Sequence, residues 1–289
     1  MTAPDGNYIF PGRTATAEEL RECIRSFCDY SLYSAERELA EGKITLKGGH
    51  RAGFTGTAVV KNGSVTMIND ISSINLRIAS EYKGIAERLV RLTTAGNDMR
   101  GLIILGPPLS AKTTMLRDYA RILSGFARTS VIDETGEIAA VYRGVPQNDV
   151  GMNCDVLDMY PKRTGIISAV RLMSPEYIIC DEIGIEYKEL AECAGKGIKL
   201  VISAHCGSMA EAADNPAVCS LVNAGAVNYA ALLSGGEKIG RIKGLWRVKK
   251  SEDIGCCGSC NDLYAGGSRV FIGAETAVRT VKACNYADK

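Results

Sequence analysis

The feature that most constrains the fold of this chain is the stretch Gly101-Leu-Ile-Ile-Leu-Gly-Pro-Pro-Leu-Ser-Ala-Lys-Thr-Thr-Met115. It contains an apolar segment, a short loop and a helix-forming segment that begins near Lys112. A buried strand, a tight loop and a helix N-terminus in this order are typical of a phosphate-binding loop. Backbone N–H groups and the positive end of the helix dipole then converge on phosphate oxygens. The stretch therefore predicts a binding site for a nucleoside triphosphate.

Two side chains of this loop have separate predicted roles. Lys112 supplies a cation for the phosphates, and Thr113 supplies a hydroxyl for a bound Mg²⁺. The spacing fits G-x-x-x-x-G-K-[ST], except that Ala111 stands where the pattern has its second glycine. If the backbone there needs a positive φ, the Cβ of Ala111 costs about 1 to 2 kcal/mol. We expect ATP to contact the whole loop, which comprises Gly106, Pro107, Pro108, Leu109, Ser110, Ala111, Lys112, Thr113 and Thr114.

The second chemical signal is the acidic pair Asp181-Glu182, which directly follows the apolar segment Tyr177-Ile-Ile-Cys180. The carboxyl ends of parallel strands are where ligands bind in an open α/β sheet. We expect Asp181 to hold Mg²⁺ and Glu182 to polarise the attacking water. The alternative is that both acids only favour the start of the next helix. Their occurrence downstream of a phosphate-binding loop, after further strands and helices, favours the functional interpretation.

Composition limits the class of protein. The chain has 289 residues, of which 46% are hydrophobic and 23% charged, so it can bury a sizeable core and suggests two domains. The formal net charge is only +1, so the chain as a whole lacks the excess positive charge that attracts nucleic acid or anionic lipid. No apolar run approaches about 18 residues and no secretory signal is visible, so no membrane-spanning helix is expected. The eleven cysteines lie mostly in apolar segments, which favours reduced thiols and a cytoplasmic protein.

Residues 1–82 predict a small α+β N-terminal domain. The capping-box spacing of Thr16 and Glu19 starts an amphipathic helix that continues to about Tyr30. Asn62-Gly63 is the dipeptide best suited to a type I′ hairpin turn. The other expected elements are a helix over 35–41, a strand over 44–46, a hairpin over 53–68 and a strand over 72–78.

Residues 83–250 alternate short apolar segments with helical patterns, which predicts an α/β domain with a mostly parallel sheet. The expected elements are helices from 83, from 112, over 163–172 and over 186–194, strands over 130–133, 177–180 and 200–204, and a hairpin of 226–233 and 241–249. Residues 251–289 are rich in Cys and Gly and form a predicted C-terminal appendage. Its one C-x-x-C pair, Cys257 and Cys260, falls short of the two pairs of a zinc ribbon, so free thiols are expected there.

Several motifs together resemble the stage III sporulation protein AA family of secretion-type ATPases, which are related to the motors of type II and type IV systems. The motifs are Gly106 to Thr114, Asp149-Val-Gly151, Asp155-Val-Leu-Asp158, Met173-Ser-Pro175, Asp181-Glu-Ile-Gly184, Ser203-Ala-His205, Ile44 to Gly53 and Ile74 to Ala79. The resemblance covers roughly residues 30–235. It implies a RecA-like P-loop NTPase domain in a cytoplasmic ATPase that forms a homo-oligomeric, hexameric ring. It also implies membrane-protein partners in the channel complex between mother cell and forespore.

The resemblance also extends to single residues. The segment Asp133-Glu134-Thr-Gly-Glu137 is similar to the acidic box of secretion ATPases, so Glu134 and Glu137 are candidates for magnesium or water contacts. The alternative is that both are solvated acids of a turn. His205 resembles the family's histidine after a strand, which can report the state of the γ-phosphate. The alternative is a loop histidine whose hydrogen bonds are satisfied locally. The expected catalytic set is therefore Glu182, Lys112, Glu134 and His205, with Thr113 and Asp181 at the metal.

Arg51 and Arg77 stand where the related motors place arginines that reach a neighbour's nucleotide, although a surface salt bridge is the alternative for either one. Besides Ala111, two further places depart from the family pattern. Leu109 replaces a basic residue, and Ala226-Val-Asn-Tyr229 replaces a Phe-Glu-Arg-like stretch.

Three function classes stay open from the sequence. The first is a motor ATPase that assembles and hydrolyses ATP. The second is a nucleotide-binding scaffold with weak or no hydrolysis, which would follow if Ala111 spoils the loop. The third is a RecA-like ATPase stimulated by nucleic acid, whose binding would fall steeply with salt. The small net charge argues against the third class, so nucleic acid is not an expected partner.

Overall fold

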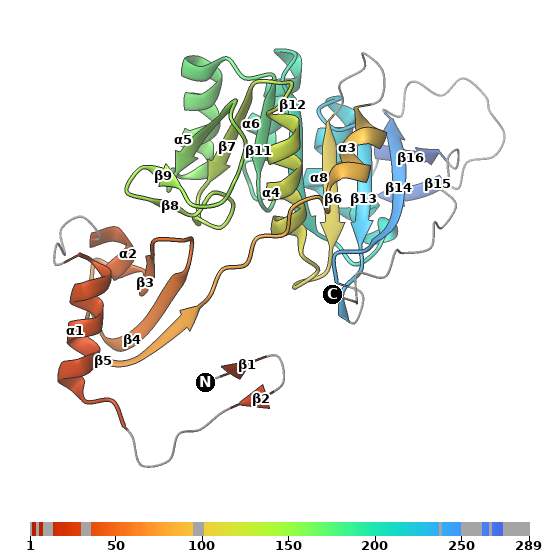
Figure 1. The fold of residues 1–289 in the computed structure, drawn as a ribbon. Helices are drawn as coiled ribbons and strands as arrows, with labels where there is room; N and C mark the ends of the chain where they lie inside the picture. Colours follow the sequence, from red (N-terminus) through yellow and green to blue (C-terminus); the bar gives the residue numbers. More distant parts are fainter. Residues whose placement is uncertain are drawn as a thin grey trace. The chain divides into compact units, whose positions relative to one another are not determined.

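The computed structural model describes residues 14–29, 36–94, 101–236 and 239–249, together with the backbone of four short strands near the ends of the chain. The chain divides into two compact units, Met1–Ser80 (unit 1) and Glu81–Lys289 (unit 2). Unit 1 is red to orange in Figure 1, and unit 2 runs from yellow to blue. The predicted boundaries at residues 82 and 250 stay predictions. The cysteines of the predicted appendage lie outside the described residues.

Unit 1 is built on a three-stranded antiparallel sheet in the order β3-β4-β5. Helices α1 and α2 both pack on β5. The predicted capping box is confirmed, because the Thr16 hydroxyl accepts the N–H of Glu19 at 3.2 Å while the Glu19 carboxylate accepts the N–H of Thr16 at 2.7 Å. The elements are β1 (Thr2–Ala3), β2 (Gly6–Asn7), α1 (Ala17–Phe27), α2 (Glu36–Ala40), β3 (Lys43–Thr45), β4 (Arg51–Lys61) and β5 (Ser64–Arg77).

The hairpin of unit 1 is longer than the sequence predicts. Its turn is confirmed, with φ values of 52° at Asn62 and 79° at Gly63. The strand predicted over 72–78, however, is the second half of β5. A register shift between Thr55 and Thr57 keeps the two strands paired, and Gly56 is required there because a Cβ would collide with the carbonyl oxygens of Asn69 and Asp70. The polar pair Asn69-Asp70 therefore marks a bulge and not a strand end.

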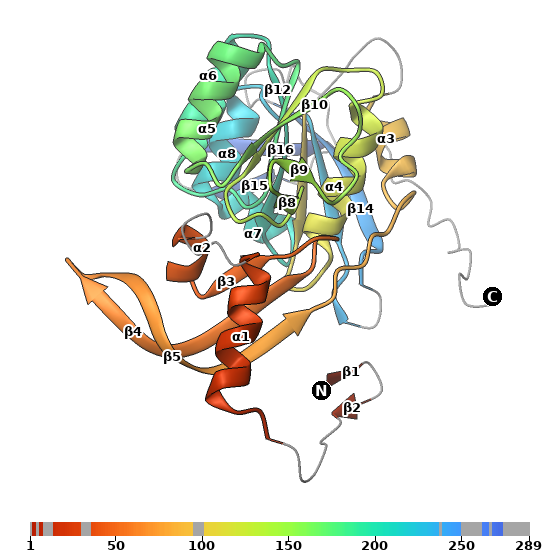
Figure 2. The ribbon, with the colours of Figure 1, turned by 60° about the vertical axis from the view of Figure 1, so that its left-hand side comes forward.

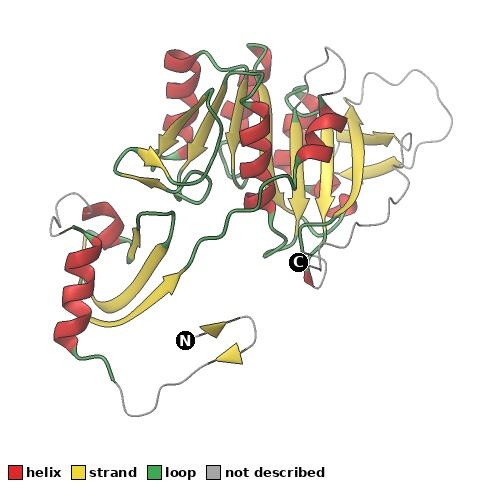
Figure 3. Ribbon diagram, viewed as in Figure 1, coloured by secondary structure: helices red, strands yellow, loops and turns green. Residues whose placement is uncertain are grey.

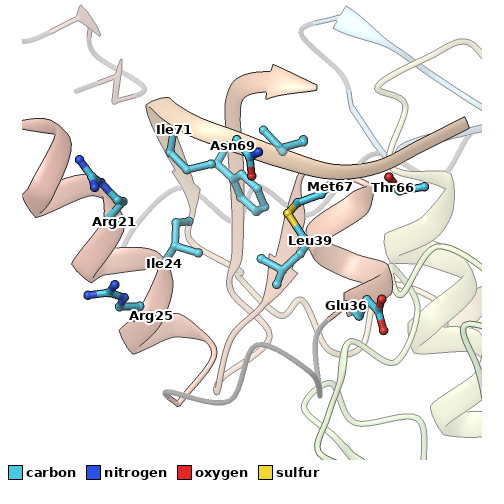
Figure 4. Close-up of a pocket in the computed structure, with 11 residues that line it drawn as sticks. Arg21, Ile24, Arg25, Glu36, Leu39, Thr66, Met67, Asn69 and Ile71 are labelled. Atoms are coloured by element: carbon cyan, nitrogen blue, oxygen red, sulfur yellow. The ribbon is translucent and has the colours of Figure 1, made fainter. Parts of the chain in front are cut away.

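A pocket of about 470 Å³ opens between α1, α2 and β5 (Figure 4). Its walls include Ile24 and Phe54 from the small apolar core of unit 1. Arg21 and Arg25 also line it, but their guanidinium groups turn to their own helix: Arg21 Nε donates to Ala17 O at 3.3 Å, and Arg25 lies 3.5 Å from Glu22. None of the predicted site residues lines this pocket.

Unit 2 is built on a nine-stranded sheet in the order β10-β7-β11-β12-β6-β13-β14-β16-β15. All pairings from β10 to β13 are parallel, and those beyond β13 are antiparallel (Figure 3). The predicted mostly parallel sheet is therefore confirmed. The strands are β6 (Leu102–Gly106), β7 (Thr129–Asp133), β10 (Cys154–Asp158), β11 (Tyr177–Cys180), β12 (Lys199–His205), β13 (Tyr229–Leu233), β14 (Ile242–Lys249), β15 (Asp262–Ala265) and β16 (Ser268–Gly273). A separate pair, β8 (Val141–Tyr142) and β9 (Val145–Pro146), follows β7.

Both faces of this sheet are covered, because successive residues of its buried strands point to opposite sides. Leu102 and Ile104 pack in one core with α3 and α4, whereas Ile103 and Leu105 pack in the other core with α5, α6 and α8. Figure 2 shows these two sets of helices on either side of the sheet. The helices are α3 (Glu87–Thr93), α4 (Lys112–Leu123), α5 (Lys162–Ser168), α6 (Tyr187–Gly195), α7 (Met209–Asp214) and α8 (Pro216–Asn223).

Some sequence-based boundaries in unit 2 are wrong. The helix expected from residue 83 begins at Glu87, and α5 passes into a π-helix at Ala169–Met173 instead of continuing to residue 172 as an α-helix. The strand expected from 226 begins at Tyr229. The sequence reading also missed β10, α7 and α8. In the part of the chain that the structure describes, no helix is both long and apolar enough to cross a bilayer.

Candidate active site

The sheet topology brings the predicted chemical residues to one edge. The strands β11, β12 and β6 are parallel neighbours, with Cys180 paired to Ile202 and His205 paired to Gly106. Their carboxyl ends therefore lie side by side, and the residues that follow them share one edge of the sheet. This edge holds the loop from Gly106 to Thr114, the Asp181-Glu182 pair and His205.

The predicted phosphate-binding loop has a backbone suited to glycine at Ala111, the position that departs from the sequence pattern. Ala111 has φ 63° and ψ 31°, in the left-handed region, and Leu109 has φ 59°. The positive φ on which the concern about Ala111 depends is therefore present, and its effect on nucleotide binding stays a prediction. Leu109 is 88% exposed, so its side chain points to solvent. A Cβ on Gly106 would also approach the hydroxyl of Ser110 so closely that this side chain would have to move.

Lys112 is the first residue of α4, and only 6% of it is exposed. Its amine donates to the carbonyl oxygens of Gly106 at 3.1 Å and Pro107 at 3.0 Å, and it lies 3.0 Å from His205 Nδ1. Burial lowers the pKa of Lys112 from its ordinary value, while the charges of Asp181 and Glu182 act in the opposite direction. The loop thus folds its own carbonyl groups around the cation that the sequence assigned to phosphate.

Asp181 joins the loop to the acidic pair. Its carboxylate accepts hydrogen bonds from the hydroxyl of Thr113, on α4, and from the hydroxyl of Ser203, on β12. The Thr113 and Asp181 side chains, predicted to share a metal, are therefore in direct contact across 68 residues of sequence.

His205 connects Lys112 with Glu182. A lysine ammonium has only donors, so Nδ1 of His205 accepts from Lys112. Nε2, at 2.6 Å from Glu182 Oε1, then carries the hydrogen and donates to that carboxylate. A continuous chain of hydrogen bonds thus runs from the Lys112 amine through His205 to Glu182.

Glu134 reaches this cluster through Lys162. Its carboxylate accepts the N–H of Lys162 at 3.2 Å and lies 3.7 Å from the Lys162 amine. That amine donates to the carbonyl oxygen of Glu182 at 2.7 Å. Glu137 contributes its carbonyl oxygen to Arg117 at 2.7 Å. Arg51 and Arg77 face each other on β4 and β5 of unit 1, and their expected role stays a prediction.

The residues present suit a nucleoside triphosphate with Mg²⁺. The hydroxyl of Ser110 is buried in the loop, and the described residues offer it no hydrogen-bond partner. An unsatisfied buried hydroxyl is costly, so a phosphate oxygen would satisfy it. The first N–H groups of α4 have no carbonyl partner within the helix, as at every helix start. The described residues contain no cluster of three or more His, Cys, Asp or Glu that could cage a metal, and Mg²⁺ is commonly held by few protein ligands together with phosphates.

Two residues of the site were missed by sequence reasoning. Ser203 lies inside the quoted Ser203-Ala-His205 motif but received no role, and Lys162 starts a helix whose boundary was misplaced by one residue. A signal for Ser203 existed, since residues two apart on a strand share a face and His205 was already assigned to the site. No signal in the sequence alone pointed to Lys162.

A protein-family model described as sporulation stage III, protein AA, matches residues 9–252 of this chain. The chain belongs to this family. The stage III sporulation protein AA of Bacillus subtilis (strain 168) is 38% identical over 221 residues, which are 74% of this chain and 72% of that protein. The resemblance inferred from the motifs is therefore confirmed.

More distant relatives and solved structures are also similar to this family member. An uncharacterised protein, ycf45, of Cyanidium caldarium is 31% identical over 53% of this chain and 46% of its own length. The VirB11 ATPase of the Brucella suis type IV secretion system has a TM-score of 0.38 at 17% identity, over 80% of each chain. The Legionella pneumophila ATPase DotB has a TM-score of 0.48 at 16% identity, over 76% of this chain and 65% of its own. The RecA-like P-loop class of unit 2 follows from its mostly parallel sheet and from the loop between β6 and α4.

Proposed function

We propose that this family member is a Mg²⁺-dependent ATPase of the secretion type. The observation that carries the proposal is the contact between Thr113 and Asp181, beside the buried amine of Lys112. A cation, a hydroxyl and two acids from distant parts of the chain meet at one sheet edge, which is the set that phosphoryl transfer needs.

Each residue of the set has a definite task in this proposal. The loop from Gly106 to Thr114 holds the phosphates, and Lys112 leaves its carbonyl partners to neutralise phosphate charge. Thr113 and Asp181 would hold Mg²⁺, which would supply positive charge against the negative charge of the phosphates. Glu182 orients the attacking water, and His205 connects Glu182 to Lys112.

Turnover of ATP with Mg²⁺ by the purified chain tests the proposal, with Lys112→Ala as the inactive reference. Glu182→Gln keeps the size of the side chain but removes its charge, so we expect it to bind ATP and to lose at least about 100-fold in turnover. Wild-type turnover no higher than that of Lys112→Ala would refute the proposed activity.

We further propose that the protein acts as a homo-oligomeric, hexameric ring in the cytoplasm and energises the membrane channel complex between mother cell and forespore. Family membership supports this proposal. Size measurement with and without ATP and Mg²⁺, beside the turnover assay, tests it. A chain that hydrolyses ATP but remains a monomer under all these conditions would exclude the ring.

The second candidate function is a nucleotide-binding scaffold with weak hydrolysis. The positive φ of Ala111 favours it, because a Cβ at this position strains the loop next to the phosphates. The scaffold predicts ATP binding without turnover, and turnover that rises in Ala111→Gly. Stimulation of turnover by DNA or RNA would instead favour the nucleic-acid-dependent class.

A further inference from the structure

The backbone of Glu182 adopts a conformation that is unusual for its residue type. Its φ is 50°, in the left-handed region, where a side chain with a Cβ is disfavoured. Residues persist in such conformations when their surroundings over-determine them, and they concentrate at functional sites. The hydrogen bonds on each side of Glu182 show which groups do this.

The N–H of Glu182 is held by a serine on the neighbouring strand. It donates to Ser203 Oγ at 2.9 Å and to Asp181 Oδ1 at 3.1 Å. The Ser203 hydroxyl donates in turn to the Asp181 carboxylate, so one fully buried hydroxyl fixes both members of the acidic pair. The next amide, that of Ile183, donates to Ser203 O at 2.9 Å.

The carbonyl group of Glu182 is held by a lysine on α5. The Lys162 amine donates to Glu182 O at 2.7 Å, and the Lys162 side chain is only 11% exposed. Lys162 is itself fixed by Glu134, which accepts its N–H and pairs with its amine. Glu134 therefore acts on Glu182 through Lys162 and not by direct contact.

Both peptide planes beside the Glu182 Cα are thus held from outside. The plane that carries its N–H is fixed by Ser203 and Asp181, and the plane that carries its carbonyl is fixed by Lys162 and by the Ile183 amide. Since φ and ψ are the rotations of these planes about the Cα, both angles are set, and with them the direction of the Cα–Cβ bond. The carboxylate then lies 2.6 Å from His205 Nε2.

We propose that Lys162 and Ser203 are positioning residues that hold Glu182 in its left-handed conformation and aim its carboxylate. This inference rests on the proposed function, in which Glu182 orients the attacking water. It also gives Glu134 the role of placing Lys162. Neither residue contacts nucleotide in this proposal, so their loss should reduce turnover without weakening ATP binding.

The test compares Lys162→Met and Ser203→Ala with matched controls. Each variant should lower kcat about 10- to 100-fold, since displacement of a catalytic group by about 1 Å has an effect of this size, while the Kd for ATP stays within about twofold. Lys162→Arg retains a donor for the carbonyl and should recover most of the kcat. The controls are Lys188→Met, an exposed lysine on α6, and Ser130→Ala, a buried strand serine whose hydroxyl has no hydrogen-bond partner among the described residues.

Hydrogen exchange of the nucleotide-free protein gives a readout that does not depend on activity. The amides of Glu182 and Ile183 should exchange at least about 10-fold faster in Lys162→Met and Ser203→Ala, while the amides of β11 keep their protection. Exchange that accelerates throughout unit 2 would indicate a folding defect and would overturn the positioning role.

Three further results separate the inference from the proposed function. If the wild type hydrolyses ATP and Lys162→Met keeps its kcat, the inference is wrong and the ATPase proposal survives. If Kd for ATP rises in step with the fall in kcat, Lys162 contacts nucleotide and is not a positioning residue. If the wild type shows no turnover but hydrogen exchange at Glu182 is faster in both variants, Lys162 and Ser203 do hold the Glu182 backbone, and the ATPase proposal fails.

Discussion

At the scale of single residues, the P-loop carries strain at a position where most such loops have glycine. Ala111 has a φ of 63°. Its methyl group lies near Gly240, because a Cβ built on Gly240 would be 3.6 Å from the Cβ of Ala111. The left-handed conformation costs a non-glycine residue roughly 1 kcal/mol, whereas glycine adopts it without penalty. The alanine is therefore tolerated at a cost in conformational energy.

We expect Ala111→Gly to leave the free energy of unfolding unchanged or to raise it by up to about 1 kcal/mol, because relief of strain offsets the greater entropy of the unfolded chain. Urea denaturation measures this. The matched control is Ala120→Gly, in the interior of α4, the helix that follows Ala111. This variant should lower the free energy of unfolding by at least about 1 kcal/mol. Equal losses in the two variants would show that Ala111 is not in the left-handed region.

At the scale of elements, the loop after β7 is organised by one buried carboxylate. Asp133, 1% exposed, accepts the N–H groups of Glu137 at 2.9 Å, Ile138 at 3.0 Å and Ala139 at 2.8 Å. Burial raises the pKa of Asp133 above its ordinary value, while these three donors oppose the rise. Arg117 binds the Ile138 carbonyl of the same loop at 2.8 Å, which ties the loop to α4.

Asp133→Asn should lower the free energy of unfolding by about 2 kcal/mol. An amide in place of the carboxylate turns an N–H₂ group toward backbone donors and leaves at least one of them buried without an acceptor. Chemical denaturation measures the loss, with Asp155→Asn, an exposed acid on β10, as the control that should change by less than about 0.5 kcal/mol. If the two variants lose the same amount, the carboxylate does not organise the loop.

The functional residues that were easiest to predict from the sequence are those that end or directly follow an uninterrupted apolar strand. Gly106, Asp181 and His205 each end or follow such a run, so their common place at the sheet edge followed from the parallel topology. Strand β10 was missed because Cys154-Asp-Val-Leu-Asp158 has an apolar run of only two residues between two acids, as it lies at the border of the sheet. A start signal for α8 was present in Asn215-Pro216, where the Asn215 side chain caps the helix.

The part of the site that could not be predicted depends on strand order. Ser203 contacts Asp181 only because β12 lies between β11 and β6 in the sheet. The spacing of these strands along the chain does not predict that order. The bond from Lys162 to Glu182 depends likewise on where α5 begins. Local patterns thus predict which residues carry the chemistry, and tertiary packing decides which residues hold them in place.

At the scale of the whole molecule, buried thiols make folding stability sensitive to alkaline pH. Burial raises the pKa of Cys154, Cys193 and Cys206 from 9.0 to about 11 and that of Cys180 to about 12. The folded chain therefore keeps thiol protons that the unfolded chain releases above pH 9. Their contribution to stability is fully present below pH 9 and is lost as the pH rises toward 11 or 12.

The free energy of unfolding should therefore fall between pH 8 and pH 10, with each of these thiols contributing about 1 kcal/mol to the fall. Because other groups also titrate in this range, the comparison that isolates a thiol is between variants. Cys193→Ala should show a fall smaller by about 1 kcal/mol than the wild type, while Cys23→Ala, at an exposed position, should show the same fall as the wild type. Urea denaturation at pH 8, 9 and 10 measures all three proteins. Identical pH dependence in Cys193→Ala and the wild type would mean that this thiol ionises as readily in the folded chain as in the unfolded one, and that its surroundings in the core admit water.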